Sequence, residues 1–225
     1  MQRLVRPPQL GLALAPVVIY LLLNGLTNRV VFEISPVLFW AVDCVFVVLL
    51  PAAILCLLSR RGVRTADYGL NSFDVSVNFI GTSVLFVILL SAAYTASQYV
   101  TWVLLWATGN EHLAQVRFTY PEVFPTGWLR APAAIYLALS AGIIESVFFI
   151  GLPWLAWRSH FGHWGKFLFS FTSSMVFAAV HWEQGLLGAS AAFAFGLVAC
   201  ALFLKVRDLW PVVAAHTLVD LVHFW

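Results

Sequence analysis

Charged residues are scarce in this sequence. Only 10% of its 225 residues are Asp, Glu, Lys or Arg, whereas globular domains usually carry about 25%. Hydrophobic residues make up 62% of the chain, and the mean hydropathy is positive. This composition excludes a soluble domain and predicts an integral membrane protein.

Basic clusters and cysteine motifs are also lacking. The net charge is only +2 and the basic residues are scattered, so we expect no nucleic acid partner. The three cysteines, Cys44, Cys56 and Cys200, lie in apolar runs without CxxC spacing. A disulfide framework or a thiolate metal site is therefore not expected. There is no internal repeat either, which disfavours a small transporter.

Long apolar runs dominate what is present. A membrane-spanning helix needs roughly 20 apolar residues. We therefore predict an all-α integral membrane protein, a bundle of about seven transmembrane helices, which forms a single membrane domain over residues 1–225. The predicted spans are 9–26, 36–58, 76–106, 131–157, 166–182, 185–204 and 209–225. The first resembles a signal peptide but has no small-residue cleavage site after it, and we interpret it as a retained helix.

The Lys and Arg residues predict the orientation of this bundle, because positively charged loops stay on the cytoplasmic side. With seven spans, nine of the twelve basic residues fall on the side of the N-terminus. These nine are Arg3, Arg6, Arg60, Arg61, Arg64, Arg158, Lys166, Lys205 and Arg207. The other side has Arg29, Arg117 and Arg130. We expect a multi-pass protein of the cell membrane, a bacterial inner membrane, with its N-terminus in the cytoplasm.

A stripe of small residues indicates which span lies at the centre of the bundle. Gly188, Ala192 and Gly196 recur at four-residue spacing. Small residues on one face of a helix allow close approach of a second backbone in lipid. We therefore expect span 185–204 to pack against other helices.

Four ionisable residues lie within the predicted spans of the C-terminal half: Glu145, His181, His216 and Asp220. Each costs about 2.5–3.5 kcal/mol in a membrane unless it faces a partner or a wet cavity. A carboxylate with imidazoles could activate water for hydrolysis. The same groups could bind Zn²⁺, and each alone could be an interhelical hydrogen-bond partner.

Three other ionisable residues receive a structural interpretation. Asp43, in the second span, and His223, at the C-terminal end, are interpreted as structural or interfacial residues. Glu183 follows His181 by two residues and could be an entrance residue of the site or a solvated helix end; we favour the solvated helix end.

The spacing of the four residues resembles the motifs of the CPBP family, the CAAX proteases and bacteriocin-processing enzymes, also called the Abi family. That family has EExxxR, FxxxH and HxxxN or HxxxD motifs on successive helices. The corresponding segments here are Glu145 to Ile150, Phe177 to His181 and His216 to Asp220. The resemblance covers residues 130–225, which would carry the catalytic core.

The resemblance implies an intramembrane endopeptidase that cleaves a membrane-anchored or C-terminal segment of a protein substrate. Glu145 would activate water with the help of His181, while His216 and Asp220 would polarise the scissile carbonyl. A glutamate mechanism without a cofactor is favoured, and Zn²⁺ is possible. The predicted orientation places the site toward the extracytoplasmic half of the bilayer. The partners would be a membrane-associated protein or peptide and the lipid bilayer.

The first motif departs from the family pattern. Ser146 replaces the second glutamate, Ile150 replaces the arginine, and the third motif ends in Asp220. These departures keep open a non-proteolytic alternative, a bacteriocin-immunity factor or a scaffold on the same fold.

Overall fold

The structure, a computed structural model, describes residues 7–116, 123–157 and 163–225. These residues contain helices and connections but no β-strand. The α-helices are α1 (Pro7–Ile34), α2 (Pro36–Asp43), α3 (Leu50–Arg60), α4 (Val77–Ala107), α5 (Arg130–Ser140), α6 (Leu152–Trp157), α7 (His163–Ala179), α8 (Gly185–Val206) and α9 (Trp210–Phe224). Three π-helical segments are η1 (Cys44–Leu49), η6 (Ala141–Glu145) and η7 (Val147–Gly151). Four 3₁₀ segments are η2 (Thr65–Tyr68), η3 (Glu111–Ala114), η5 (Gly127–Leu129) and η8 (Trp182–Gln184). The all-α prediction is confirmed for this part of the chain.

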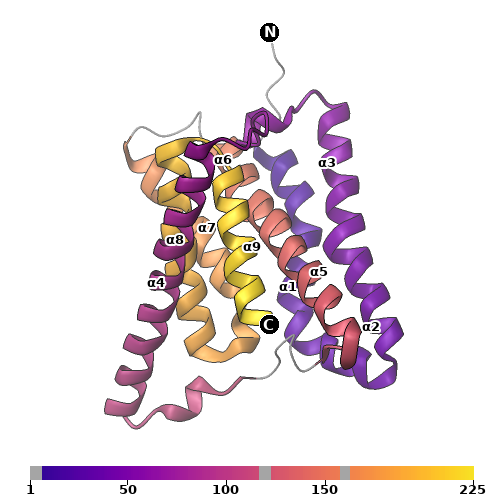
Figure 1. Cartoon of the computed structure of the whole chain (residues 1–225), viewed down its shortest axis with the longest axis vertical. Helices are drawn as coiled ribbons and strands as arrows, with labels where there is room; N and C mark the ends of the chain where they lie inside the picture. Colours follow the sequence, from indigo (N-terminus) through magenta and orange to yellow (C-terminus); the bar gives the residue numbers. More distant parts are fainter. Residues whose placement is uncertain (1–6, 117–122, 158–162) are drawn as a thin grey trace.

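The helices run alternately up and down between two ends of the molecule (Figure 1). We call the end where α3 ends and α4 begins the upper end, and the end where α1 is followed by α2 the lower end. The helix α1 descends, α2 to α3 ascends, α4 descends, α5 to α6 ascends, α7 descends, α8 ascends and α9 descends. Each predicted span therefore corresponds to one helical stretch of this alternating arrangement.

Not all seven of these helical stretches are long and apolar enough to cross a membrane. Four stretches are long and apolar enough to cross a membrane: 36–60, 77–107, 127–157 and 182–206. The helix α1 makes a fifth if its two parts, which meet at 67°, form one span. The helices α7 and α9 have 17 and 15 residues, about 25 and 22 Å at 1.5 Å per residue, which is less than the roughly 30 Å of a bilayer core. The prediction of about seven spans is therefore supported for four or five.

Local sequence signals explain where several helices begin. Ser35 and Ser76 precede α2 and α4, and their side chains accept hydrogen bonds from the backbone N–H groups of Leu38 and Phe79. Such caps satisfy donors that the first helical turn leaves free. Pro36 then occupies the first turn of α2, where no donor is needed. The apolar helix interiors satisfy their own backbone groups, as a bilayer requires.

The small-residue stripe of α8 faces its neighbours as predicted. Gly188, Ala192 and Gly196 are all buried, and α8 packs between α4 and α7. A Cβ atom on Gly196 would lie 3.0 Å from Ser174 Oγ on α7. Close contact between helices is confirmed there, whereas the neighbour of Gly188 is Gln184, the last residue of η8, directly before the same helix.

Candidate functional site

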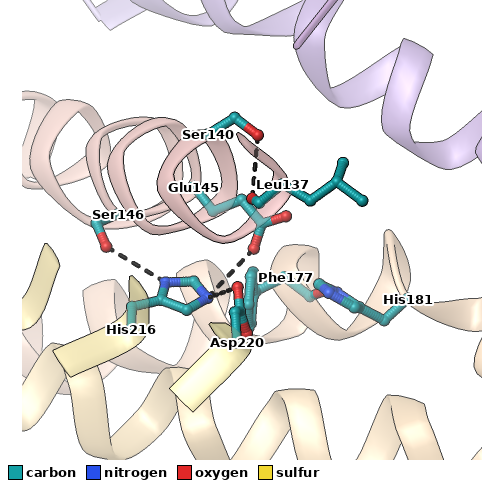
Figure 2. A network of polar contacts seen from close by, with 8 residues as sticks. All are labelled: Leu137, Ser140, Glu145, Ser146, Phe177, His181, His216 and Asp220. Atoms are coloured by element: carbon teal, nitrogen blue, oxygen red, sulfur yellow. Dashed lines mark hydrogen bonds and ion pairs between the residues drawn. The ribbon is translucent and has the colours of Figure 1, made fainter. Parts of the chain in front are cut away.

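Glu145, His216 and Asp220 meet between η6 and α9 (Figure 2). His216 Nε2 lies 3.6 Å from Glu145 Oε2 and 3.4 Å from Asp220 Oδ2. The imidazole is buried, and both carboxylates are largely covered. One ring nitrogen therefore faces two carboxylates that come from separate helical stretches, 75 positions apart at their extremes. These three residues, far apart in the sequence, are therefore brought together by the fold.

Irregular helix geometry carries Glu145 into this position. Glu145 is the last residue of η6, and a second π-helical segment, η7, begins two residues later. Single π turns inside α-helices are frequent at functional sites because they shift the side chains that follow. Gly142 helps the approach, since a Cβ atom there would lie 2.9 Å from the backbone nitrogen of Thr217. Glycine at this position thus lets η6 and α9 touch backbone to backbone.

Ser146 completes the surroundings of the His216 ring. Its hydroxyl oxygen is buried and lies 3.4 Å from His216 Nδ1. Ionised carboxylates only accept hydrogen bonds; beside them, Nε2 of a neutral His216 would carry the proton and Nδ1 would accept from the Ser146 hydroxyl. The sequence motif marks Ser146 only as the replacement of a glutamate. Its contact with His216 was missed, because nothing in a sequence tells which buried serine faces a histidine 70 positions away.

His181 lies beside this group without joining its hydrogen bonds (Figure 2). Its Nδ1 lies 2.7 Å from the carbonyl oxygen of Phe177. A carbonyl can only accept, so Nδ1 is the protonated nitrogen and Nε2 of the neutral ring is left as an acceptor. The Phe177 ring contacts both imidazoles, with centroid distances of 4.6 Å to His181 and 6.0 Å to His216. Phe177, the first residue of the second motif, thus separates the two histidines.

All four predicted site residues line one cavity of about 590 Å³. Its wall includes side chains of α4 and α9, and of the segments around Asp43, Glu145 and Glu183. Apolar and hydroxyl-bearing side chains line the rest, among them Val87, Ser91 and Phe195. The volume lies within the usual range for ligand sites, about 300–1,000 Å³. The cavity can accommodate a short stretch of an extended peptide next to Glu145.

The interpretation of Glu183 as a solvated helix end is wrong. Only 4% of this residue is exposed, and it lines the same cavity. The sequence was misleading because a glutamate directly after an apolar run can be buried or can lie at a helix end in water, and the pattern is the same in both cases. Asp43 fits its structural interpretation, since it is buried and accepts a hydrogen bond of 2.9 Å from Tyr136. His223 also lines the cavity and contacts the Tyr94 ring.

At the position where the family motif has an arginine, this chain has an apolar side chain. Ile150 is buried in the main hydrophobic cluster, close to Glu145 and His216. No guanidinium stands at this position to pair with a carboxylate. Among the described residues, no group of three His, Cys, Asp or Glu side chains is arranged to hold a metal ion. The prediction that no cofactor is needed stays a prediction.

Comparison with known proteins identifies a relationship for the C-terminal half. Residues 127–222 match the family of type II CAAX prenyl endopeptidase Rce1-like proteins. The match begins and ends within three residues of the region 130–225 in which the sequence motifs were found, and it contains all four predicted site residues. Neither a curated protein nor a solved structure matches the chain.

Proposed function

We propose that this chain, a member of the CPBP family through residues 127–222, is an intramembrane endopeptidase that uses Glu145 as its general base. The family match to a prenyl endopeptidase type implies a membrane-bound protease acting on a protein or peptide. It lends no support to an immunity factor or a scaffold. The substrate would be a membrane-anchored or C-terminal segment of another protein.

The convergence of Glu145, His216 and Asp220 in one cavity carries this proposal. Glu145 Oε2 faces His216, which leaves the second carboxylate oxygen for a water molecule. His181 Nε2 is an acceptor and would help to orient that water. His216 Nε2–H is a donor that could turn from the carboxylates to the oxyanion of a bound substrate. Asp220 and Ser146 would hold the His216 ring in place.

The proposed reaction moves one proton in a closed sequence. Glu145 takes a proton from water while the oxygen forms a bond to the scissile carbonyl carbon. The tetrahedral intermediate then collapses, the C–N bond breaks, and protonated Glu145 returns the proton to the leaving amine. Proton transfer of this kind contributes about 10²–10⁴-fold to the rate of an enzyme. No metal ion is required in this scheme.

Substitution of Glu145 tests the proposal. We expect Glu145→Gln to lower cleavage of apolar quenched peptides and of prenylated tail peptides in proteoliposomes by about 100-fold or more, because an amide does not accept a proton from water. Expression and the thermal unfolding midpoint should stay close to those of the wild type, since Gln has the same shape.

Glu111→Gln is the matched control, because Glu111 lies in the exposed η3 segment and does not line the cavity. It should cleave at the wild-type rate. Near wild-type cleavage by Glu145→Gln would contradict the proposal. A second arm with a metal chelator tests the scheme itself, since loss of wild-type activity in chelator would replace direct activation by Glu145 with metal-assisted hydrolysis.

We further propose that the cavity opens on the extracytoplasmic side. The described basic residues are divided unequally between the two ends of the molecule. Six belong to the upper end: Arg60, Arg61, Arg64, Lys166, Lys205 and Arg207. Two, Arg29 and Arg130, belong to the lower end. Positive charge favours the cytoplasmic side, and the cavity is bordered at the lower end by η8. An exported or surface-anchored substrate suits this orientation.

Thiol labelling tests the orientation. In a variant without its native cysteines, single cysteines would replace Ser59, near the end of α3, and His112 in η3, both of which are exposed. A membrane-impermeant maleimide added to intact cells should label position 112 and spare position 59. The opposite pattern would place the cavity mouth in the cytoplasm and would favour a cytosolic tail as substrate.

A further inference from the structure

A row of polar side chains on α4 faces the cavity. Ser91, Thr95 and Gln98 all line it, and their spacing of four and three residues puts them on one face of the helix. We call these three residues the α4 polar row. The ring of Tyr94, the residue before Thr95, contacts the His223 ring with 6.4 Å between the centroids. The row therefore runs beside the last turns of α9, the helix that carries part of the site.

The α4 polar row differs from the polar residues that α4 uses for packing. The Ser97 hydroxyl donates a hydrogen bond of 2.9 Å to the carbonyl oxygen of Ser190 on α8, and Thr101 donates one of 2.9 Å to the Ser190 hydroxyl. The side chains of the row have no hydrogen-bond partner among the described residues, and none is among the polar atoms that protein encloses completely. Their donors and acceptors are therefore open to the cavity. Polar groups in a membrane persist where they face a partner or a wet cavity.

The chemistry of the row indicates which partner it suits. Hydroxyl and carboxamide groups both donate and accept hydrogen bonds and carry no charge. The helix α4 has no Asp, Glu, Lys, Arg or His over residues 77–107. A peptide backbone is equally uncharged and alternates donors with acceptors. A substrate segment that unwinds around its scissile bond loses its helical hydrogen bonds, and lipid offers none in exchange.

The spacing of the row fits an extended peptide. Four residues of an α-helix rise about 6 Å, the separation of Ser91 and Thr95 along the helix axis. Backbone groups on one side of an extended chain recur every two residues, about 6.6 Å apart. Gln98 lies about 4.5 Å further along α4, and its longer side chain extends the row to a further backbone group. A segment lying along α4 would therefore meet the row with successive backbone groups.

We propose that Ser91, Thr95 and Gln98 bind the backbone of the substrate and hold it extended beside Glu145. This inference rests on the proposed peptidase function and names the conformation in which that site takes its substrate. The contacts are made to N–H and C=O groups, so they place the scissile bond without selecting particular side chains. They assign to α4, which lies outside the family match, a direct contact with the substrate.

Backbone substitution in the peptide tests this inference. The probes are fluorescein-labelled apolar 12-residue peptides in which an ester replaces one amide at a time, which removes one N–H and keeps every side chain. Fluorescence anisotropy measures their binding to full-length Glu145→Gln protein in nanodiscs, with empty nanodiscs as the blank. We expect the ester to weaken binding about 10-fold relative to the all-amide peptide at one or two positions, which corresponds to about 1.4 kcal/mol.

Two variants in the same background assign this effect to the row. Gln98→Leu and Thr95→Val each remove polar atoms at nearly constant size. At a sensitive position, the ratio of the ester and amide dissociation constants should fall to near one in at least one of them. Asn78→Leu is the matched control, since Asn78 is an exposed carboxamide on α4 that does not line the cavity. It should keep the full ratio.

Three outcomes would overturn the inference: no saturable binding of the all-amide peptide, equal binding of all ester peptides, or an unchanged ratio in every folded variant of the row. The last two would leave water or lipid as the partner of the row. If Gln98→Leu fails to fold, Thr95→Val and the ester series on the parent protein still decide.

The binding measurement is independent of cleavage. An ester effect that the row variants abolish, without any cleavage by the wild type, would refute the proposed function and keep the backbone-binding role of α4. Cleavage of the all-amide peptide by the wild type without an ester effect on binding would do the reverse.

Discussion

The helices of residues 36–107 and those of residues 127–206 are both apolar enough to span a membrane, yet they differ in what surrounds them. In the spans 36–60 and 77–107, only 22% and 17% of the most apolar stretch is buried inside the molecule. The corresponding shares for 127–157 and 182–206 are 61% and 44%. The first two spans therefore leave most of their side chains for lipid, whereas protein covers most of 127–157 and nearly half of 182–206.

This difference coincides with the distribution of chemistry. The family match covers residues 127–222 and contains all four predicted site residues: Glu145 in the span 127–157, His181 directly before the span 182–206, and His216 and Asp220 on α9, which follows it. The lipid-facing helices contribute wall residues to the cavity, such as Val47, Ser91 and Thr95. Burial in protein lets a span carry ionisable groups at a tolerable free-energy cost, whereas a lipid-facing span must stay apolar. We infer that the N-terminal helices enclose the site and that the C-terminal helices perform its chemistry.

The strongest test of this division concerns His216. We expect His216→Leu to lower the rate of peptide cleavage by about 100-fold or more, because both nitrogen contacts to Glu145 and Ser146 are lost with the ring. The measurement is kcat in proteoliposomes, with size-exclusion chromatography as a check of folding.

His112 offers a matched comparison, since it is exposed in η3, outside the family match. His112→Leu should leave kcat unchanged. A loss in both variants, or in neither, would mean that the covered region does not carry the chemistry alone.

The second test compares two glycines in helices of similar composition. We expect Gly196→Leu to lower the free energy of unfolding by about 3 kcal/mol, because the added atoms meet Ser174 in a close-packed contact. Gly81 on α4 is exposed, and a Cβ atom added there would meet no other atom within 4 Å, so Gly81→Leu should have little effect. Thermal unfolding in detergent measures both. Equal shifts would show that α8 and α4 face the same surroundings.

Much of the helical arrangement could be predicted from the sequence. Runs of apolar residues indicate all seven helical stretches, since a bilayer admits few alternatives to a helix. The lengths of α7 and α9 were less predictable. The apolar pattern predicts a span over 166–182 that continues through His181, but the α-helix ends at Ala179. The chain then turns through η8 into Gly185, a turn that an apolar pattern does not reveal.

The sequence was sufficient to select the four residues of the candidate site, but not to predict how they are arranged. Helical spacing places His216 and Asp220 on one face, and their contact confirms it. Glu145 reaches them through π-helical turns, which shift the register by an amount that 3.6-residue periodicity cannot supply. The burial of Glu183 was not predicted, because its neighbours Trp182 and Gly185 contact segments far away in the chain. Such contacts are tertiary and leave no local signal.

The smallest effect that we expect concerns the hydrogen bond between the two regions. Tyr136 on α5, inside the family match, donates to Asp43 on α2, outside it, over 2.9 Å. Asp43 is buried and lines the cavity together with Glu145. It is thus the carboxylate through which the N-terminal helices could take part in the chemistry.

We expect Tyr136→Phe to lower the free energy of unfolding by about 1 kcal/mol, the usual contribution of one hydrogen bond. Cleavage should stay within about threefold of the wild type, because less than 1 kcal/mol of transition-state stabilisation would be affected. The two readouts are thermal unfolding and kcat/KM with the same peptide. A stability loss with near-normal cleavage would fit an enclosing role for the N-terminal helices, whereas a cleavage loss of about 100-fold at unchanged stability would make Asp43 part of the reacting site and end the division between the two regions.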